Sequence, residues 1–455
     1  MTTLPSTTPL DALAPDLRGR LLRPDDPGYA ELAVPWNVAF WDPAAGPVAV
    51  VEALDAQDVA ATVRHAVAQG LQVAVQSTGH GATGVAPGTV LVHTGRMTEL
   101  TVAHGRVRAG AGVRWTDVLA ATPDGLAGLT GSAPDVGVVG YLTGGGHGPV
   151  ARTFGVASDR VTAFEVVTGD GAVRRATAGE NPALFWGLRG GRGALGIVTA
   201  VEFSLVELPA LLAGSLWFDG AEAARVLHAW REWTATLPEQ ATSSVAIVRL
   251  PPEAGPLGGR VSVAVRYAWV GDPDTGRRIL DEAGFPAPLL GGVGPMPYAQ
   301  IGSVHADPVD PMPVHEASTL LGSLPAEAVD AVLAAAGPEA DCPQIVVELR
   351  HLGGALARPG EPSAVSHRGA AFCLSSIGIA APPTRPHGRA LLAAVAPWST
   401  GGRLPNFAAS AEPAEVARAY DPGTLSRLST LVATYDPHGV IAAAAPVRAA
   451  VMQDR

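Results

Sequence analysis

Three glycine-rich loops interrupt the first half of this 455-residue chain, at residues 77–84, 129–155 and 190–196. Glycine has no Cβ atom, so a backbone rich in it can approach an anion closely and turn successive N–H groups toward it. Three such loops in one region could enclose one long, phosphate-bearing ligand. Because the chain contains 54 glycines, the loops could equally be ordinary turns, and the pattern alone does not decide.

Two of these loops match the pattern G-x-G-x-x-G, at residues 79–84 and 191–196. In a Rossmann dinucleotide site this pattern follows a strand and opens a helix, which then presents its N-terminus to the pyrophosphate. Here the first loop is followed by a predicted strand, and the second comes after a predicted helix and before a strand. The sequence therefore argues against a Rossmann site.

The composition excludes several classes of function. All 31 basic residues are arginines, which rules out a P-loop lysine, a Schiff-base lysine and a protein-kinase ion pair. A net charge of −11 argues against a nucleic-acid or membrane surface. Two cysteines, Cys342 and Cys373, are too few for a cysteine-rich zinc site or a disulfide framework, so no metal site is predicted.

The N-terminus lacks the charged start and apolar run of a signal peptide. The longer apolar stretches are far shorter than the ~20 residues that cross a bilayer. We therefore expect a cytoplasmic protein that does not bind membranes.

Hydrophobic periodicity predicts alternating strands and helices after residue 47. Asp55 is placed to cap a helix that Gly70 ends, and valines recur at every fourth position between them. Residues 161–177 form a predicted hairpin whose Asp-Gly turn suits that role. Further strands are predicted at 48–51, 71–75, 90–93 and 197–205, and a short helix at 181–188.

Beyond about residue 206 the pattern changes to strands mixed with helices and many Pro and Gly turns. This arrangement predicts an antiparallel sheet with covering helices. The predicted helices span 221–236, 325–336 and 422–434, and the predicted strands span 260–270, 344–352 and 370–379.

Several short motifs are individually weak, but their order along the chain is specific. The motifs are Trp36-Asn37, Gly79-His80, 144–148 with Arg152, Gly155 and Asp159, 181–186, 189–191, 196–199, 353–354, His367-Arg368, Asn406-Phe407, Arg427-Leu428 and 435–437. In this order they make the chain resemble the berberine-bridge-enzyme-like FAD-linked oxidoreductases of the vanillyl-alcohol-oxidase / p-cresol-methylhydroxylase flavoprotein superfamily. The resemblance covers about residues 22–205 and 347–440.

The resemblance implies an α+β fold. It consists of a two-part FAD-binding domain of the p-cresol-methylhydroxylase type and an antiparallel-sheet substrate domain covered by helices. We place the first FAD-binding part at 1–205, the substrate domain at 206–400, and a C-terminal segment that returns to the FAD-binding domain at 401–455.

The resemblance also implies a covalently bound FAD. The family's histidine in the first glycine loop, here His80, bonds to the flavin 8α carbon, and Ala133 stands where a second, cysteine anchor would be. We therefore expect FAD to be attached through His80 only. The residues expected to contact it are Ser77, Thr78, Gly79, His80, Gly81, Ala82, Ser132, Gly137, Gly140, Tyr141, Gly144, Gly145, Gly196, Ile197, Val198 and Asn406.

The implied activity is an oxidase that removes hydride from an alcohol-type C–H carbon of a small organic molecule, with O2 as acceptor and H2O2 as product. Natural-product tailoring is the favoured role. A sugar or oligosaccharide oxidase, or a flavoprotein catalysing a net non-redox cyclisation or isomerisation, are the alternatives. We expect no nucleic-acid partner, and a monomer or homodimer.

The catalytic base does not carry over from the resemblance, because many family members have tyrosine directly after the C-terminal asparagine and this chain has Phe407. Glu348 lies on a predicted apolar strand, where burial could raise its pKa to a useful value. Alternatively, it is a structural carboxylate paired with Arg350. Tyr141 and Tyr298 are the other catalytic candidates, and His147, His305 and His315 are further candidates for the pocket wall.

Overall fold

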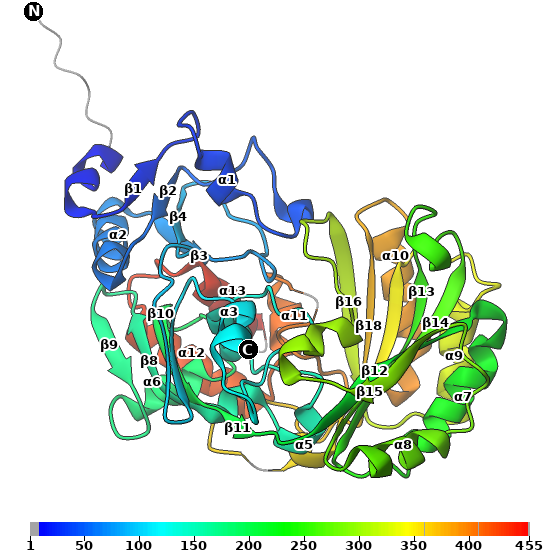
Figure 1. Ribbon diagram of the computed structural model, residues 1–455. Helices are drawn as coiled ribbons and strands as arrows, with labels where there is room; N and C mark the ends of the chain where they lie inside the picture. Colours follow the sequence, from blue (N-terminus) through cyan, green and yellow to red (C-terminus); the bar gives the residue numbers. More distant parts are fainter. Residues whose placement is uncertain (1–8, 359, 408, 454–455) are drawn as a thin grey trace, which may run out of the picture.

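The computed structural model describes residues 9–358, 360–407 and 409–453. The chain forms two parts that lie side by side (Figure 1). One contains a four-stranded, a five-stranded and a two-stranded sheet, and the other contains a single seven-stranded sheet. The fold is α+β, as predicted. Among the described residues, no helix has the length and apolar character needed to cross a membrane.

The N-terminal sheet combines parallel and antiparallel pairing. Helix α2 (Ala56–Gln69) packs beside it; Asp55 accepts hydrogen bonds from two backbone N–H groups at its start, and Gly70 ends it with φ +66°. This confirms the predicted cap and stop. Strand order is β1 (Arg20–Leu22), β2 (Ala49–Glu52), β4 (Thr89–His93), β3 (Gln72–Gln76), with β2, β4 and β3 parallel.

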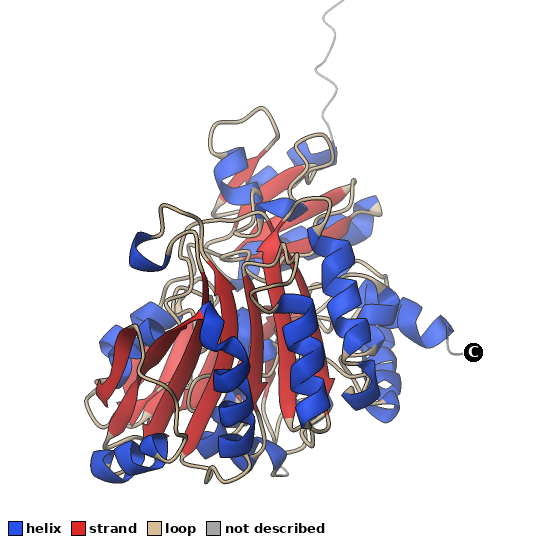
Figure 2. Ribbon diagram, turned by 90° about the vertical axis from the view of Figure 1, so that its right-hand side faces the viewer, coloured by secondary structure: helices blue, strands red, loops and turns tan. Residues whose placement is uncertain are grey.

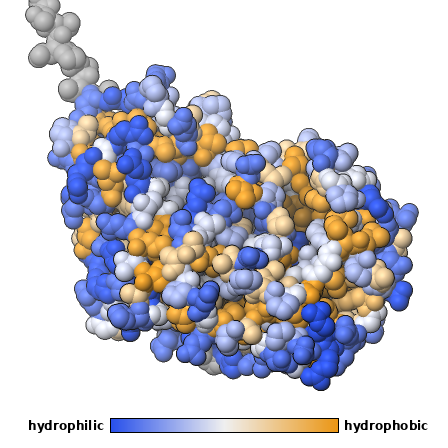
Figure 3. Space-filling view, in the orientation of Figure 1, coloured by the Kyte–Doolittle hydropathy of each residue, from blue (hydrophilic) through white to orange (hydrophobic). Residues whose placement is uncertain are grey.

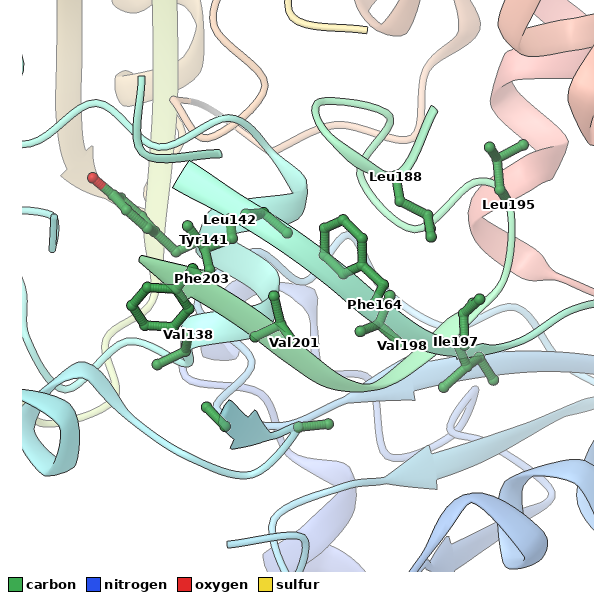
Figure 4. Packing of buried hydrophobic residues seen from close by; sticks show 14 of the residues in the cluster. Val138, Tyr141, Leu142, Phe164, Leu188, Leu195, Ile197, Val198, Val201 and Phe203 are labelled. Atoms are coloured by element: carbon green, nitrogen blue, oxygen red, sulfur yellow. The ribbon is translucent and has the colours of Figure 1, made fainter. Parts of the chain in front are cut away.

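A second, antiparallel sheet contains the predicted hairpin and the strand that follows the third glycine loop. Its buried face packs against α4 (Val138–Thr143), where Leu142 lies near Phe164 and Val201 of the strands (Figure 4). The strand order is β5 (Leu100–Ala103), β6 (Arg106–Gly110), β10 (Ile197–Ser204), β8 (Val161–Val167), β9 (Val173–Ala176).

The large sheet is antiparallel, with helices across its outer face (Figure 2). Trp230, Val329 and Leu391, from three of these helices, share one hydrophobic cluster with alternate residues of the strands. The strand order is β15 (Leu290–Pro295), β12 (Leu211–Asp219), β14 (Val261–Val270), β13 (Ala241–Arg249), β17 (Val346–His351), β18 (Phe372–Ile379), β16 (Val314–Leu321), and the helices are α7 (Ala223–Thr234), α9 (Ala326–Ala336) and α10 (Thr384–Ala394).

The C-terminal segment leaves the large sheet and packs on the N-terminal part (Figure 1). Helix α12 (Pro422–Tyr435) contacts α6 (Pro182–Leu188), and the Val73 N–H donates to the Val440 carbonyl at 2.7 Å. The remaining elements are α1 (Tyr29–Ala33), α3 (Trp115–Ala121), α5 (Ala151–Phe154), α8 (Pro273–Asp281), α11 (Pro413–Ala417), α13 (Ala445–Gln453), β7 (Leu126–Ala127) and β11 (Val206–Glu207).

Arg152, on α5, joins the two parts. Its guanidinium donates to the backbone carbonyls of Ala241 (2.8 Å), Leu237 (3.0 Å) and Leu352, which belong to the large sheet and its connections. Burial lowers the pKa of Arg152 to about 10, so the group stays charged at neutral pH. A second link is the two-fold hydrogen bond from Arg368 to Asp159, at 2.9 and 2.7 Å.

We predict that Arg152→Met lowers the free energy of unfolding by about 3 kcal/mol or more, because hydrogen bonds from a charged donor contribute about 1.5–3 kcal/mol each and several buried carbonyls lose their partner. Urea unfolding followed by circular dichroism measures this. Arg225→Met is the matched control, since Arg225 is exposed on α7 and its contact with Glu222 is a surface ion pair. Equal losses in the two variants would contradict the assignment of Arg152 as the link.

Candidate active site

One large cavity lies between the two parts of the molecule. Its volume is about 1070 Å³, at the upper end of the range for small-molecule and cofactor sites. All three glycine loops line it on one side, and strands β14, β16, β17 and β18 line it on the other. Figure 3 shows a notch in the outline between the two parts on one face of the molecule.

The first glycine loop follows the carboxyl end of β3, the edge of a parallel sheet where ligands commonly bind. Gly79 has φ +77°, and a Cβ atom there would lie 2.6 Å from the Cα atom of Pro35. Only glycine fits this turn. The loop backbone therefore runs along the cavity wall with no side chain between it and a ligand.

His80 follows Gly79 and is held on three sides. Its ring stacks on Trp36 with 4.6 Å between centroids, Nδ1 lies 3.0 Å from Thr78 Oγ1, and Nε2 lies 3.2 Å from Asp135 Oδ2. Burial lowers the pKa of His80, and the Asp135 carboxylate only partly opposes this shift. The imidazole is thus largely neutral at pH 7, the form in which one ring nitrogen keeps its lone pair.

The second loop and the C-terminal segment meet at Asn406. Its side-chain N–H donates to the Tyr141 carbonyl at 2.9 Å. A Cβ atom on Gly144 would lie 1.9 Å from the Asn406 side-chain oxygen, so a glycine is required beneath this amide. The contact places Asn406 on the cavity wall.

Arg192, in the third loop, connects the first loop to the C-terminal segment. It donates to the Gly81 carbonyl at 3.0 Å and to the Pro405 carbonyl. Burial lowers the pKa of Arg192, with nearby Arg403 acting in the same direction. This residue was not singled out from the sequence.

The predicted cofactor residues lie around the cavity with two exceptions. Gly144 lies under Asn406, and Gly145 lies near His147 and Val156, so neither is on the wall. Those that line it are Ser77, Thr78, Gly79, His80, Gly81, Ala82, Ser132, Gly137, Gly140, Tyr141, Gly196, Ile197, Val198 and Asn406.

The large sheet contributes charged residues to the opposite wall. Ser244 on β13 pairs directly with Arg266 on β14 and with Arg350 on β17, so the three side chains project from the same face. Two residues along β17, Glu348 projects from that face as well. The intervening residues point the other way, into the cluster under the helices.

The structure corrects the expectation for Glu348. Its Oε1 accepts hydrogen bonds from Ser244 and Arg266 at 2.7 Å each, and its Oε2 accepts one from Arg350 at 2.7 Å. Burial alone would raise the pKa of Glu348, but the two guanidinium groups hold it well below its usual range. The expectation of a raised pKa is wrong, and the pairing with Arg350 is confirmed. A carboxylate held this firmly in its charged form is a weak proton acceptor.

The two tyrosine candidates are poorly placed to lose a proton. Tyr298 does not line the cavity; its hydroxyl oxygen accepts a hydrogen bond from the Thr130 N–H at 3.3 Å, and burial raises its pKa. Tyr141 lines the cavity, but burial raises its pKa well above the usual value. Within the described residues, its hydroxyl has no hydrogen-bond partner.

The three histidine candidates lie in three different places relative to the cavity. His147 lines the cavity, and burial with help from Arg368 lowers its pKa to about 4. His305 is buried behind the charged wall, with Nε2 3.5 Å from Glu348 Oε1. His315 projects from the outer face of β16, where Nδ1 lies 3.3 Å from an Arg385 nitrogen of α10.

Glu316 is a cavity carboxylate that the sequence reasoning missed. It lies on β16 next to His315 and lines the cavity, and its Oε2 accepts a hydrogen bond from the Ala409 N–H at 3.4 Å. Water reaches it through the cavity, but surrounding protein atoms raise its pKa, and Arg192 only partly offsets this effect. The alternation of side chains along a strand could have indicated it, once the cavity-facing residues of β16 were known.

No cluster of three or more potential ligating residues is found in the part of the chain that the structure describes. Both cysteines are free, and Cys373 is buried.

Residues 47–177 match the family described as FAD binding domain. The chain is 36% identical over 204 residues to (R)-6-hydroxynicotine oxidase of Paenarthrobacter nicotinovorans, covering 44% of each chain. It is 34% identical over 209 residues to berberine bridge enzyme-like 5 of Arabidopsis thaliana, covering 42% of this chain and 38% of that relative. The chain therefore contains an FAD-binding domain, and in these two matches it is similar to the berberine-bridge-enzyme-like FAD-linked oxidoreductases over less than half of its length.

Solved structures extend this match over the whole fold of the family. The structure of 6-hydroxy-D-nicotine oxidase from Arthrobacter nicotinovorans superposes with a TM-score of 0.80 and 25% identity, over 92% of this chain and 96% of that one. Wild-type BBE-like 1 of Physcomitrella patens superposes with a TM-score of 0.81 and 17% identity, over 96% and 98%. The sequence matches, in contrast, span less than half the length of these curated relatives.

The cavity fits the FAD that this family binds. The matched FAD-binding region contains the first two glycine loops, and both line the cavity. At Gly140, no atom lies within 4 Å of where a Cβ would be, so the backbone there is open to a ligand. The loop backbones on this wall would hold the cofactor, with Asn406 beside them.

Proposed function

We propose that this protein is an FAD-dependent oxidase that removes hydride from an alcohol-type C–H carbon of a small organic molecule, with O2 as acceptor and H2O2 as product. The observation that carries the proposal is the single cavity that brings the FAD-binding glycine loops to the charged face of the large sheet. Natural-product tailoring is the role we propose.

Relatives named as oxidases support the proposal, among them (R)-6-hydroxynicotine oxidase. One is named glucooligosaccharide oxidase, from Sarocladium strictum, 30% identical over 173 residues. A sugar oxidase remains the alternative within this class. It is less favoured because the sheet residues that line this cavity include no aromatic side chain on which a sugar ring could stack.

Bound FAD supplies a two-electron acceptor for a substrate hydride and returns those electrons to O2. The protein must position the substrate and accept the hydroxyl proton as the carbon–oxygen double bond forms. Glu316 is the proton acceptor we propose, because it faces the cavity and lacks the two guanidinium partners that tie Glu348. A raised pKa brings a carboxylate closer to the value that suits a general base at neutral pH.

The oxidase assignment predicts rapid reaction of the reduced protein with oxygen. Dithionite-reduced protein, freed of excess reductant without air, is mixed with aerated buffer in a stopped-flow spectrophotometer. We expect the flavin to reoxidise faster than free reduced FAD and to release one H2O2 per flavin. Reoxidation slower than that of free reduced FAD would favour the non-redox alternative, and a colourless native protein would overturn the proposal entirely.

Covalent attachment through His80 predicts that acid-precipitated, washed protein stays yellow. His80→Ala should release the flavin into the supernatant, because Ala133 offers no second anchor. His315→Ala is the control, since that histidine projects from the outer face of the sheet. A colourless pellet from the unmodified protein would disprove the covalent bond.

If Glu316 accepts the proton, Glu316→Gln should lower the rate of anaerobic flavin reduction about 10²–10⁴-fold. With the unmodified protein, the rate should fall as the pH drops through the raised pKa of Glu316, because protonation removes the base. That acid limb should disappear in the variant. The test substrate comes from a screen of primary and secondary alcohols, and Glu327→Gln on the outer face of α9 is the control. An unchanged acid limb in Glu316→Gln would exclude this role.

The proposal also includes a cytoplasmic location and a monomeric or homodimeric state. It places the boundaries of the substrate domain at residues 206 and 400. Each of these rests on the sequence and its resemblance to the family.

A further inference from the structure

Two arginines on the cavity wall share one carboxylate. Arg266 and Arg350 each donate to Glu348 at 2.7 Å, and neither forms another ion pair among the described residues. Burial and the two guanidinium groups lower the pKa of His305, so it is largely neutral at pH 7. The group of Arg266, Arg350, Glu348 and His305 therefore carries a net positive charge of one, with the Asp307 carboxylate acting on Arg350 without forming an ion pair.

Both arginines have unused hydrogen-bond donors in a place where unused donors are costly. The Arg266 side chain is only 7% exposed, and its Nε has no partner. A guanidinium has five N–H donors, and a buried charge without compensation is strongly unfavourable. The two arginines therefore have N–H donors for a further hydrogen-bond acceptor, and the described residues do not supply one.

The orientation of Arg350 directs its unused donors into the cavity. Its Nε is held by Glu348, and its guanidinium lies over the Phe407 ring at 5.1 Å from the centroid. These contacts leave the two terminal nitrogens without a hydrogen bond to the described residues, and Arg350 lines the cavity. The Phe407 ring thus serves as a flat support for the Arg350 guanidinium.

Other charged groups on the wall leave these donors without a hydrogen-bond partner. Asp307 lines the cavity, and its carboxylate helps to raise the pKa of Arg350, but it forms no ion pair with either guanidinium in the described residues. The donors of Arg350 that face the cavity therefore remain available to a ligand.

We infer that Arg266 and Arg350 bind a carboxylate group of the substrate, so that the molecule oxidised is an organic acid that also carries the alcohol. A guanidinium recognises a carboxylate through two parallel N–H···O bonds, which fixes orientation as well as charge. That this acid is oxidised rests on the proposed function. The anion site itself depends only on the two arginines.

Benzoate and its neutral analogue benzamide test this inference on the flavin-loaded protein. Isothermal titration calorimetry in a chloride-free buffer measures affinity, and the flavin absorbance reports whether the ligand enters the same cavity. We expect saturable binding of benzoate with a perturbed flavin spectrum, and no binding of benzamide at the same concentrations. Equal binding of the two compounds would overturn the inference.

Variants of the shared carboxylate and its partner should act in opposite directions. Arg350→Gln should weaken benzoate binding at least about tenfold, since a hydrogen bond to a charged group contributes roughly 1.5–3 kcal/mol. Glu348→Gln should strengthen it, because the internal competitor for the arginines is gone. Arg225→Gln, on the exposed face of α7, should change nothing. If Arg350→Gln binds benzoate as well as the unmodified protein does, the inference fails.

Two further arms keep the test decisive. If Glu348→Gln does not fold, Arg350→Lys replaces it: a retained charge should keep binding closer to that of the unmodified protein than Arg350→Gln does. If chloride binds as tightly as benzoate, the site takes any small anion and the organic-acid inference is wrong. A colourless protein that still discriminates benzoate from benzamide would contradict the proposed function but not the anion site.

Discussion

Arg152 fastens the N-terminal part of the chain to the large sheet, and the cavity between the two parts depends on this link. The charged group of Arg152 lies inside the protein and donates to carbonyl groups of the chain that leads into β13 and out of β17. A buried cation is tolerated only where acceptors surround it. Separating the two parts would therefore cost free energy, because the guanidinium and the carbonyl groups would lose their hydrogen-bond partners. The glycine loops therefore stay opposite the charged face of the sheet.

Across that cavity, the two walls are built differently. The wall formed by the glycine loops is largely backbone, since Gly79 leaves no space for a side chain against Pro35 and the backbone at Gly140 is open to the cavity. The opposite wall is made of side chains from alternate positions of paired strands, in which Ser244, Arg266 and Arg350 stand in one row. One wall thus suits a cofactor bound through N–H groups, and the other can vary its chemistry by single substitutions.

Much of the fold could be predicted from periodicity and turn chemistry. The helix capped by Asp55, the hairpin at 161–177 and the helices α7, α9 and α12 were predicted to within a few residues. The strands at 100–103 and 106–110 were not, because both are short, the second carries two arginines, and the pair joins the sheet only when 106–110 pairs with β10. The local sequence of a strand does not indicate a pairing strand that lies about 90 residues away in the chain.

The sequence by itself indicated the ordered motifs and most of the residues that line the glycine-loop wall of the cavity, because glycines and a single loop histidine are local requirements. Only the tertiary structure decided the chemistry of the other wall. Glu348 was expected to gain a raised pKa from burial, yet two arginines from different strands hold it in the opposite state. The pKa of a carboxylate depends on the charges that surround it in space. Arg350 is two residues away on β17, but Arg266 reaches Glu348 only when β14 and β17 both pair with β13.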